Sequence, residues 1–298
     1  GEEDYKEITD FLNTVYLQEN DKVKFEISID KYIYTGLENG NKIKLADVIL
    51  YVLDSRAPFS CLNPNVQKIV HGKPIIYVFN KFDLADEVRV KQIQEEFENE
   101  GKICISVSAT SVNFKSSVKN ALKRVLKEKE DRNKEKGINA TYKVLVLGVP
   151  NTGKSTLINM LSGAKKAVTG NIAGVTKVNK WIKIDDSFML LDTPGVLWPK
   201  FDDGISRNLA YVGSLSDKEF DLSDLGYELM QIVYEKYPDN LKQKFDVDFE
   251  HEDFIELYDR FCKKRGFIMR GNEIDYNRAG KQFIDDFRAG KFGRITLE

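Results

Sequence analysis

Residues Gly148–Ser155 have the sequence GVPNTGKS and connect an apolar run, Tyr142–Leu147, to a helical pattern that starts at Lys154. This GxxxxGKS spacing is typical of a loop whose backbone N–H groups surround phosphate oxygens at the positive end of a helix. In such a loop the Lys154 amine reaches the β- and γ-phosphates, and the Ser155 hydroxyl is a ligand of Mg²⁺. A glycine-rich turn without a ligand is the alternative, but the strand–loop–helix context favours a phosphate site.

Four more apolar runs resemble the strand that precedes this loop. They are residues 48–53, 74–79, 103–107 and 187–191, and a polar residue comes at the end of each. Continuous apolar strands are typical of a sheet that is buried on both faces. Helical patterns at 87–99, 114–130 and 154–161 alternate with the strands. The sequence therefore predicts a doubly wound, mostly parallel α/β sheet whose ligands bind at the carboxyl ends of the strands.

The length of 298 residues predicts about two domains. Residues 42–204 hold the alternating pattern and form the expected nucleotide-binding domain. Residues 205–298 are expected to form a small all-helical domain, because only amphipathic helical patterns remain there. Those patterns cover residues 222–237, 252–264 and 278–288.

Residues 1–41 combine a helical pattern at 3–19 with an alternating strand pattern at 22–30. We expect this segment to be a divergent amino-terminal extension that packs on the nucleotide-binding domain. Its acidic start, GEEDYKEITD, resembles neither a secretory signal nor a transit peptide.

Composition excludes several classes of protein. The 45 Lys and Arg residues nearly balance the 47 Asp and Glu residues, which argues against a polybasic nucleic-acid-binding protein. No apolar run approaches the roughly 20 residues that a membrane-spanning helix needs. Cys61, Cys104 and Cys262 form no CxxC pair, so neither a zinc site nor a disulfide framework is expected. These features favour the cytoplasm.

Three more motifs follow predicted strands. Asp192-Thr-Pro-Gly195 offers a carboxylate for Mg²⁺ and the Gly195 N–H for a γ-phosphate, although alone it could be a turn. In Asn80-Lys-Phe-Asp83 the Asp83 carboxylate can accept hydrogen bonds from N1–H and the exocyclic amine of guanine, whereas adenine presents the wrong donors. Ser108-Ala-Thr110 would bring backbone groups to guanine O6. The motifs together favour GTP over ATP.

The four motifs match the signature of GTP-binding proteins of the translation-factor type, but the base motifs precede the phosphate motifs along the chain. That order resembles a circularly permuted P-loop GTPase, in which each motif keeps its strand end in one sheet. The flanking sequence over residues 42–298 is similar to the YlqF/RbgA family of ribosome-biogenesis GTPases. The segments that carry the similarity are DSRAP (54–58), NKFDLAD (80–86), GVPNTGKSTLIN (148–159), GVTK (174–177), DTPGVLWPKF (192–201) and RAGKFGRITLE (288–298).

The resemblance implies a GTP site with Mg²⁺ and K⁺ bound beside the phosphates. The expected GTP-binding residues are Asn80, Lys81, Asp83, Ser108, Ala109, Thr110, Pro150, Asn151, Thr152, Gly153, Lys154, Ser155, Thr156 and Gly195. The expected metal ligands are Ser155, Thr176 and Asp192 for Mg²⁺ and Asn151 for K⁺. The expected catalytic residues are Lys154, Thr176 and Gly195, of which Thr176 matches a switch threonine that closes on Mg²⁺ and the γ-phosphate.

Hydrolysis is where the sequence departs from the family pattern. Val196 stands where Ras-like proteins have a glutamine that orients the attacking water, which an apolar side chain cannot do. Family members usually have a WFPGHM-like segment near the amino terminus, and its histidine is implicated in hydrolysis. Residues 1–41 contain no histidine, and the two histidines of the chain, His71 and His251, are expected at the surface. Either another residue or the ribosome replaces this group, or hydrolysis is impaired.

The resemblance implies a monomeric GTPase that acts in assembly of the large ribosomal subunit, slowly unless ribosomal particles stimulate it. Its partners would be GTP or GDP and the large subunit or its precursor, with rRNA at the basic stretch 260–298 and no membrane. We expect the segment after Asp192 to relay the nucleotide state to the helical domain. Two alternatives stay open: a GTP-dependent scaffold with little hydrolysis, and a GTPase switch for a non-ribosomal protein.

Overall fold

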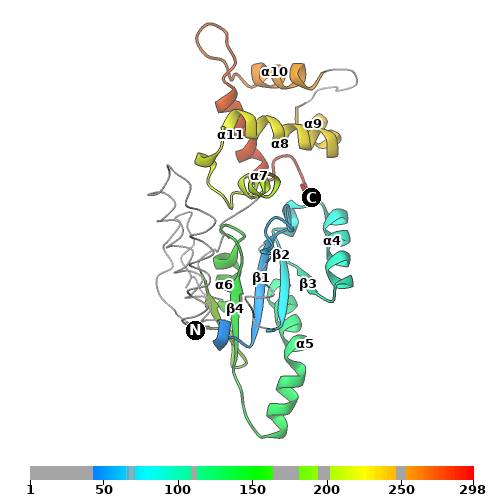
Figure 1. The fold of residues 1–298 in the computed structure, drawn as a ribbon, viewed down its shortest axis with the longest axis vertical. Coiled ribbons are helices and arrows are strands. Elements are labelled where there is room, and N and C mark those ends of the chain that lie inside the picture. The colour runs from blue at the N-terminus through cyan, green and yellow to red at the C-terminus, as the bar shows by residue number, and fades with distance from the viewer. Residues whose placement is uncertain are drawn as a thin grey trace, which may run out of the picture.

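The structure is a computed structural model, and it describes residues 43–64, 66, 70, 72–108, 113–163, 181–193, 202–245 and 253–298. The helix expected at 3–19, the strand expected at 22–30 and the rest of the extension 1–41 lie outside the described residues. A β-sheet with flanking helices forms one part of the molecule, and a second group of helices lies beyond one end of its strands (Figure 1).

Within the described residues, one sheet has six strands in the order β3-β2-β1-β4-β6-β5. The strands are β1 (Val48–Asp54), β2 (Ile75–Asn80), β3 (Ile103–Ser106), β4 (Tyr142–Leu147), β5 (Trp181–Lys183) and β6 (Phe188–Asp192). Every neighbouring pair is parallel except β5 with β6. This confirms the mostly parallel α/β sheet. The sequence pattern missed β5, a strand of three residues at the edge of the sheet.

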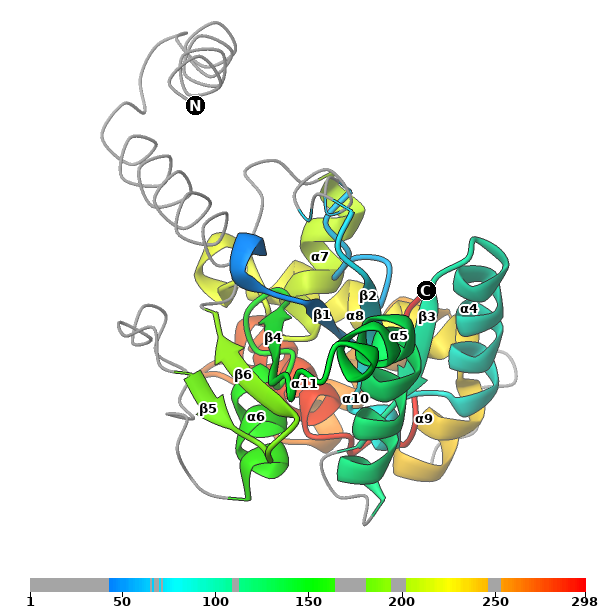
Figure 2. The same ribbon diagram turned by 90° about the horizontal axis from the view of Figure 1, so that it is seen from below.

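Helices cover both faces of the sheet, which explains the continuous apolar strands. On one face Tyr51 and Phe79 pack with Phe97 of α4 (Glu87–Asn99). On the other face the strands pack against α5 (Phe114–Glu135) and α6 (Lys154–Ser162), which lie on the same side of the sheet in Figure 2. Strand residues of even and odd number therefore alternate between two apolar cores.

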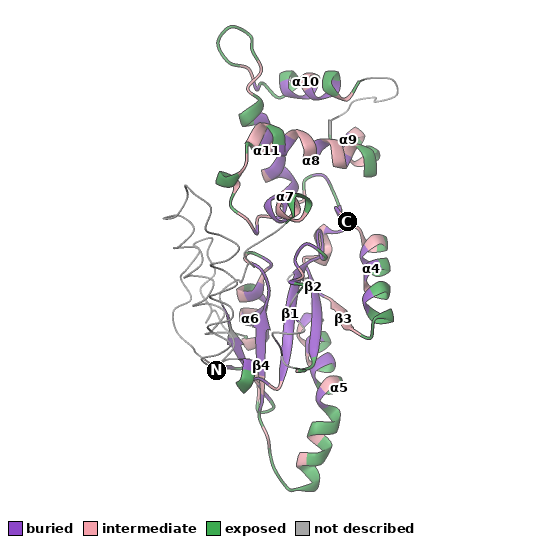
Figure 3. Ribbon diagram, in the orientation of Figure 1, coloured by how far each residue is buried: buried purple, intermediate pink, exposed green. Residues whose placement is uncertain are grey.

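The helix α5 continues to Glu135, five residues beyond the predicted end at residue 130. The added turn belongs to a mixed-charge run whose side chains are mostly exposed (Figure 3). It includes an ion pair between Lys134 and Glu130, four residues apart. Such pairs stabilise an exposed helix without apolar contacts, so the charged run extends the helix.

The described chain beyond β6 is mainly helical, with one isolated antiparallel β-bridge between Ile268 and Ile274. The helices are α7 (Asp203–Tyr211), α8 (Leu222–Lys236), α9 (Pro238–Phe245), α10 (Phe254–Lys264) and α11 (Tyr276–Arg288), with the 3-10 turn η2 (Asp217–Glu219). An aspartate side chain caps the first turn of four of them: Asp202, Asp221, Asp253 and Asp275 accept from backbone N–H groups. The prediction of helices α8, α10 and α11 is confirmed, whereas α7 and α9 were missed.

A common apolar core joins these helices to each other and to the sheet. Leu229 of α8, Phe283 of α11 and Phe261 of α10 belong to it, and so does Ala57 from the loop after β1. The last residues of the chain, Ile295 and Leu297, are buried in the same core. The division at residue 204 into two domains stays a prediction. None of the described helices is long and apolar enough to cross a membrane.

Candidate functional site

The carboxyl ends of β1, β2, β4 and β6 lie side by side and bring the sequence motifs together. In the sheet Asp54 is opposite Asn80, and Val146 of β4 is opposite Asp192. The GxxxxGKS loop follows β4 directly, and NKFD begins at the last residue of β2. Motifs that are far apart along the chain therefore share one edge of the sheet.

The geometry of the GxxxxGKS loop depends on its glycines. Gly153 has φ 92°, and a Cβ there would lie 2.3 Å from Asn80 Nδ2. Gly148 has φ 145°, and a Cβ there would lie 2.4 Å from the Val52 carbonyl oxygen. Positive φ is strained for residues with side chains, and neither position has space for one. The loop can thus approach β1 and the NKFD segment closely enough to form one site.

The loop forms a cradle at the amino end of α6. Lys154, the first residue of α6, is buried, and its Nζ donates to the Val149 carbonyl at 2.7 Å. The Thr152 hydroxyl also donates to Val149 O, at 3.1 Å. Ser155 and Thr156 follow in the first turn of the helix. The lysine amine is thereby enclosed by its own loop, where it can exchange a carbonyl for a phosphate oxygen.

Side chains of the NKFD segment hold the cradle in place. Asn80 Nδ2 donates to the Thr152 carbonyl at 2.7 Å, and Lys81 Nζ donates to the Asn151 carbonyl at 2.8 Å. Lys81 itself has φ 57°, a conformation uncommon for a residue with a side chain. Asp83 lies in the 3-10 turn η1 (Phe82–Leu84) and is partly exposed. The base motif and the phosphate motif are thus one hydrogen-bonded unit.

The segment after β3 lies beside this unit. Val107 N donates to Phe79 O at 2.9 Å, and Phe82 N donates to Val107 O at 3.2 Å. Ser108 comes next and is partly exposed, so SAT begins at the same edge as NKFD. Ala109 and Thr110 lie outside the described residues.

A buried ion pair at the end of β1 is a part of the site whose role the sequence analysis missed. Asp54 is fully buried and forms ion pairs with Arg56 at 2.9 Å and with Lys81 of NKFD at 2.7 Å. Burial alone raises the pKa of Asp54, but the charges of Arg56 and Lys81 outweigh it and hold this pKa well below its usual range. The carboxylate is therefore charged next to the base motif. The sequence did contain a signal for this residue, because Asp54 directly follows the apolar run 48–53 and polar residues at strand ends are candidates for the site.

The helical part of the chain contacts the site at the carboxyl ends of the strands. Ser214 donates its hydroxyl to the Pro150 carbonyl at 2.7 Å, and Asn151 Nδ2 donates to the Gly213 carbonyl at 2.6 Å. The carboxyl-terminal tail, residues 295–298, also reaches the base side: Ile295 N donates to Leu84 O at 3.1 Å. Both the phosphate loop and the base loop thus touch residues beyond position 205.

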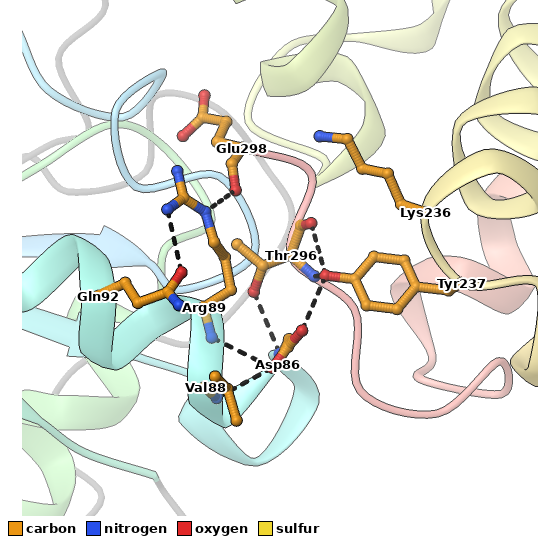
Figure 4. A pocket seen from close by; sticks show the side chains of 8 residues that line it. All are labelled: Asp86, Val88, Arg89, Gln92, Lys236, Tyr237, Thr296 and Glu298. Atoms are coloured by element: carbon orange, nitrogen blue, oxygen red, sulfur yellow. Dashed lines mark hydrogen bonds between the residues drawn. The ribbon is translucent and has the colours of Figure 1, made fainter.

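A separate pocket of about 440 Å³ lies where the tail crosses between α4 and α8 (Figure 4). Arg89 Nε donates to the Glu298 carbonyl at 2.7 Å, and the Tyr237 hydroxyl donates to Asp86 Oδ2 at 3.2 Å. None of the lining residues belongs to the GxxxxGKS loop. The pocket therefore lies between the two parts of the chain and is distinct from the phosphate cradle.

Several predicted site residues fall outside the described residues. They are Ala109, Thr110, Thr176, Gly195 and Val196, and the histidines His71 and His251. Asp192 is described only as a backbone position at the end of β6. Its neighbour Thr193 donates its hydroxyl to Val146 O at 2.6 Å, which fixes the start of DTPG against β4.

The donor set suits a magnesium ion that is bound mainly through a nucleotide. Among the described residues, no three His, Cys, Asp or Glu side chains come together as a metal cage. Mg²⁺ commonly takes one or two protein ligands and completes its shell with phosphates and water. The glycine cradle, with Ser155 at the start of α6, has the chemistry for that arrangement. The predicted protein ligands are Ser155, Thr176 and Asp192, and of these only Ser155 has a described side chain.

Comparison with known proteins agrees with this geometry. The family model of the 50S ribosome-binding GTPase matches residues 143–237. The chain is 38% identical over 259 residues to ribosome biogenesis GTPase A of Bacillus cereus, covering 86% of this chain and 88% of that protein. It is 30% identical over 257 residues to ribosome biogenesis GTPase A of Thermotoga maritima, covering 86% and 87%.

Solved structures show the same architecture. The GDP-bound structure of Thermotoga maritima YlqF matches with a TM-score of 0.62 and 27% identity, covering 88% of this chain and 98% of that one. The GNP-bound YlqF structure of the same organism matches with a TM-score of 0.59 and 26% identity, covering 93% and 98%. One of these neighbours is GDP-bound and the other is GNP-bound.

Proposed function

This chain belongs to the ribosome biogenesis GTPase A family, and from that membership we propose that it binds a precursor of the large ribosomal subunit and hydrolyses GTP upon release. A GTPase of ribosome biogenesis is what the relatives' names support. One observation carries the nucleotide part of the proposal. Asn80 and Lys81 of the base motif hydrogen-bond directly to Thr152 and Asn151 of the phosphate loop.

In this proposal each part of the site binds one part of GTP. Asp83 accepts the N1–H and exocyclic amine of guanine, and the segment 108–110 contacts O6. The backbone of residues 150–156 surrounds the phosphates, and the Gly195 N–H contacts the γ-phosphate. Mg²⁺, held by Ser155, Thr176 and Asp192, would supply charge neutralisation at the β- and γ-phosphates. A K⁺ ion would take the amide oxygen of Asn151, whose nitrogen donates to Gly213 O.

Hydrolysis in this proposal depends on charge and position. The Lys154 amine neutralises negative charge that develops on the bridging and γ-oxygens, while Thr176 and Gly195 fix the γ-phosphate. Val196 cannot orient water, so turnover is slow until a ribosomal particle stimulates it. The protein works as a monomer in the cytoplasm, where ribosomal subunits are assembled.

We also propose that the nucleotide state moves the helical part. The segment 193–201 links β6 to α7, so its displacement by the γ-phosphate would tilt the helices. The bonds from Ser214 to Pro150 and from Asn151 to Gly213 support a direct link between the phosphate loop and these helices. Lengthening the chain after Lys200 with flexible residues should uncouple GTP binding from partner binding, and unchanged coupling would contradict this route.

The rRNA contact of this proposal lies around the end of α10. The stretch 260–298 is basic, but part of its charge is already paired: Arg288 binds Asp217 at 2.5 Å and Lys291 binds Asp286 at 2.8 Å. Some cations of this stretch are exposed whether or not they are paired, and Arg265 is itself 3.7 Å from Asp286. The exposed cations near the end of α10 and beyond it include Lys263, Lys264, Arg265, Arg270 and Arg278. Binding should weaken steeply with added salt, as phosphate contacts do.

GTP hydrolysis in KCl and in NaCl, with and without purified large ribosomal subunits, tests the whole proposal. Stimulation by subunits in KCl alone supports both the assembly role and the K⁺ at Asn151. Tight GTP binding without stimulated turnover supports the alternative of a GTP-dependent scaffold with little hydrolysis. Failure to co-sediment with ribosomal particles in any nucleotide state would point instead to a non-ribosomal partner.

A further inference from the structure

Asp54 lies between two cations, Arg56 from the loop after β1 and Lys81 from the end of the neighbouring strand β2. Its Oδ2 accepts from Lys81 Nζ at 2.7 Å and from Arg56 Nη2 at 2.9 Å, and its Oδ1 accepts from Arg56 Nε at 2.9 Å. Lys81 belongs to the base motif, and the same amine donates to Asn151 O of the phosphate loop. The Asp54 carboxylate therefore hydrogen-bonds to the same Lys81 amine that joins the base motif to the phosphate loop.

We propose that Asp54 is a positioning residue for guanine-nucleotide binding, which it serves by holding the Lys81 amine against the Asn151 carbonyl. The inference rests on the proposed function, since it concerns the same nucleotide site. Asp54 would not touch the nucleotide; it would act through Lys81.

Lys81 requires such a partner because a lysine side chain is long, flexible and strongly hydrated. A neutral carbonyl, as at Asn151, attracts an ammonium group less than a carboxylate does. Lys81 also begins from a backbone with φ 57°, and only about a quarter of its side chain is exposed. With Asp54 in place the amine has a fixed charged partner on one side and the phosphate loop on the other.

Asp54 can fix Lys81 because it is itself immobile. The Arg56 guanidinium binds it through two parallel bonds, and the Arg56 backbone N–H donates to Oδ1 at 3.1 Å. Ser55, the residue between them, donates its N–H and hydroxyl to Asn80 O at 2.9 Å and 2.7 Å. The two strand ends, β1 and β2, are therefore locked in register at the base motif.

Arg56 extends this arrangement to the helical part. Its Nη1 donates to the carbonyl of Arg288 at 3.2 Å, and its guanidinium lies 5.2 Å from the centre of the Phe287 ring. Both residues are at the carboxyl end of α11, where carbonyl groups and the helix dipole favour a cation. Arg56 thus balances the Asp54 charge while Lys81 remains directed to the phosphate loop.

A double-mutant cycle with a fluorescent GDP analogue, mant-GDP, tests this role. Asp54→Asn keeps the shape but removes the charge, and Lys81→Met removes the amine. Each variant should weaken the affinity for mant-GDP by about 10- to 100-fold. The double variant should bind no more weakly than Lys81→Met, because Asp54 acts only through Lys81. The proposal would be overturned if the two losses of affinity multiplied in the double variant. It would also be overturned if Asp54→Asn bound mant-GDP with wild-type affinity.

Asp47→Asn is the matched control. Asp47 directly precedes β1, its carboxylate pairs with Lys129 and accepts from Lys143 N, and it lies at the opposite end of the same strand. This variant should bind mant-GDP as the wild type does. If Asp47→Asn lost as much affinity for mant-GDP as Asp54→Asn, then removing any ion pair at β1 would have this effect. That result would also overturn the proposal.

Steady-state kinetics separate positioning from misfolding. Asp54→Asn should raise the KM for GTP while kcat stays within about twofold, since the proposed site assigns the γ-phosphate to Lys154, Thr176 and Gly195 and not to Asp54 or Lys81. A fall in kcat at unchanged KM would overturn the proposal, because it would indicate a smaller folded fraction. If thermal unfolding shows that Asp54→Asn does not fold, Asp54→Asn/Arg56→Gln removes both buried charges and carries the same expectation. Wild-type protein that fails to bind mant-GDP would refute the proposed function instead.

Discussion

Replacing Gly226 by alanine should destabilise the helical part, because α8 and α11 touch backbone to backbone at this residue. A Cβ on Gly226 would lie 2.1 Å from Gly280 Cα, and a Cβ on Gly280 would lie 2.0 Å from Leu222 O. Ordinary Cβ contacts begin at about 3.4 Å. The two helices must therefore separate by more than about 1 Å to admit one methyl group. No side-chain rotation can relieve the clash, since the opposing atoms are main chain.

The expected cost follows from two opposing effects. Overpacking a well-packed core costs about 1–3 kcal/mol, and here the separation also loosens Leu229 and Phe283, which are completely buried. Alanine in place of glycine within a helix returns about 1 kcal/mol. Because the clash is with main chain, we expect the upper end of the cost. The net loss is about 2 kcal/mol, or about 3 °C in Tm for a chain of this size.

Thermal unfolding followed by circular dichroism measures this loss, and Gly204→Ala is the matched control. Gly204 is also helical, in the first turn of α7, but a Cβ there would meet only Asp202 Oδ1 at 3.6 Å. Its Tm should stay the same or rise slightly. A Gly226→Ala variant that unfolds at or above the temperature of Gly204→Ala would refute the close crossing of α8 and α11.

Three more predictions concern the site. Asp83→Asn should shift preference from guanosine to xanthosine nucleotides, measured by competition binding, and an unchanged preference would show that the base pocket is elsewhere. Gly153→Ala should weaken GDP binding by about tenfold or more in calorimetry, because its Cβ would displace the Asn80 amide at 2.3 Å; wild-type affinity would contradict the assigned contact. The lowered pKa of Asp54 means that its charge stabilises the fold above the unfolded pKa of about 4 and that this contribution disappears as the pH falls through its lower folded pKa. In urea unfolding, the stability gap between wild type and Asp54→Asn should therefore narrow below about pH 4, and a constant gap would contradict the buried ion pair.

The sequence predicted most elements of the sheet because burial on both faces leaves a continuous apolar pattern. Tyr142–Leu147 and Glu87–Asn99 have the predicted bounds. Trp181–Lys183 was missed because three residues at a sheet edge do not make a pattern. The helix Asp203–Tyr211 was missed for a related reason, since it is short and its apolar positions are few.

The site was predictable where chemistry depends on local spacing. GxxxxGKS and NKFD are local motifs, and the structure places them together. The contact of Asp54 with Lys81 was not predictable, because Lys81 becomes its neighbour only through the pairing of β1 with β2. The contact of Asn151 with Gly213 joins positions that are 62 residues apart, and no local pattern indicates it.

The order of strands in the sheet has a consequence for how the chain folds during synthesis. β1, β2 and β3 are adjacent in the sheet and are synthesised before β4 to β6, so the half that carries NKFD can fold before the GxxxxGKS loop exists. The second half, β4 to β6, then attaches along one seam, where Val48–Tyr51 pairs with Val144–Leu147. A nucleotide that contacts both halves would stabilise the pairing of β1 with β4. When nucleotide is bound, the backbone amides that pair β1 with β4 should therefore exchange their hydrogens more slowly than in the nucleotide-free protein.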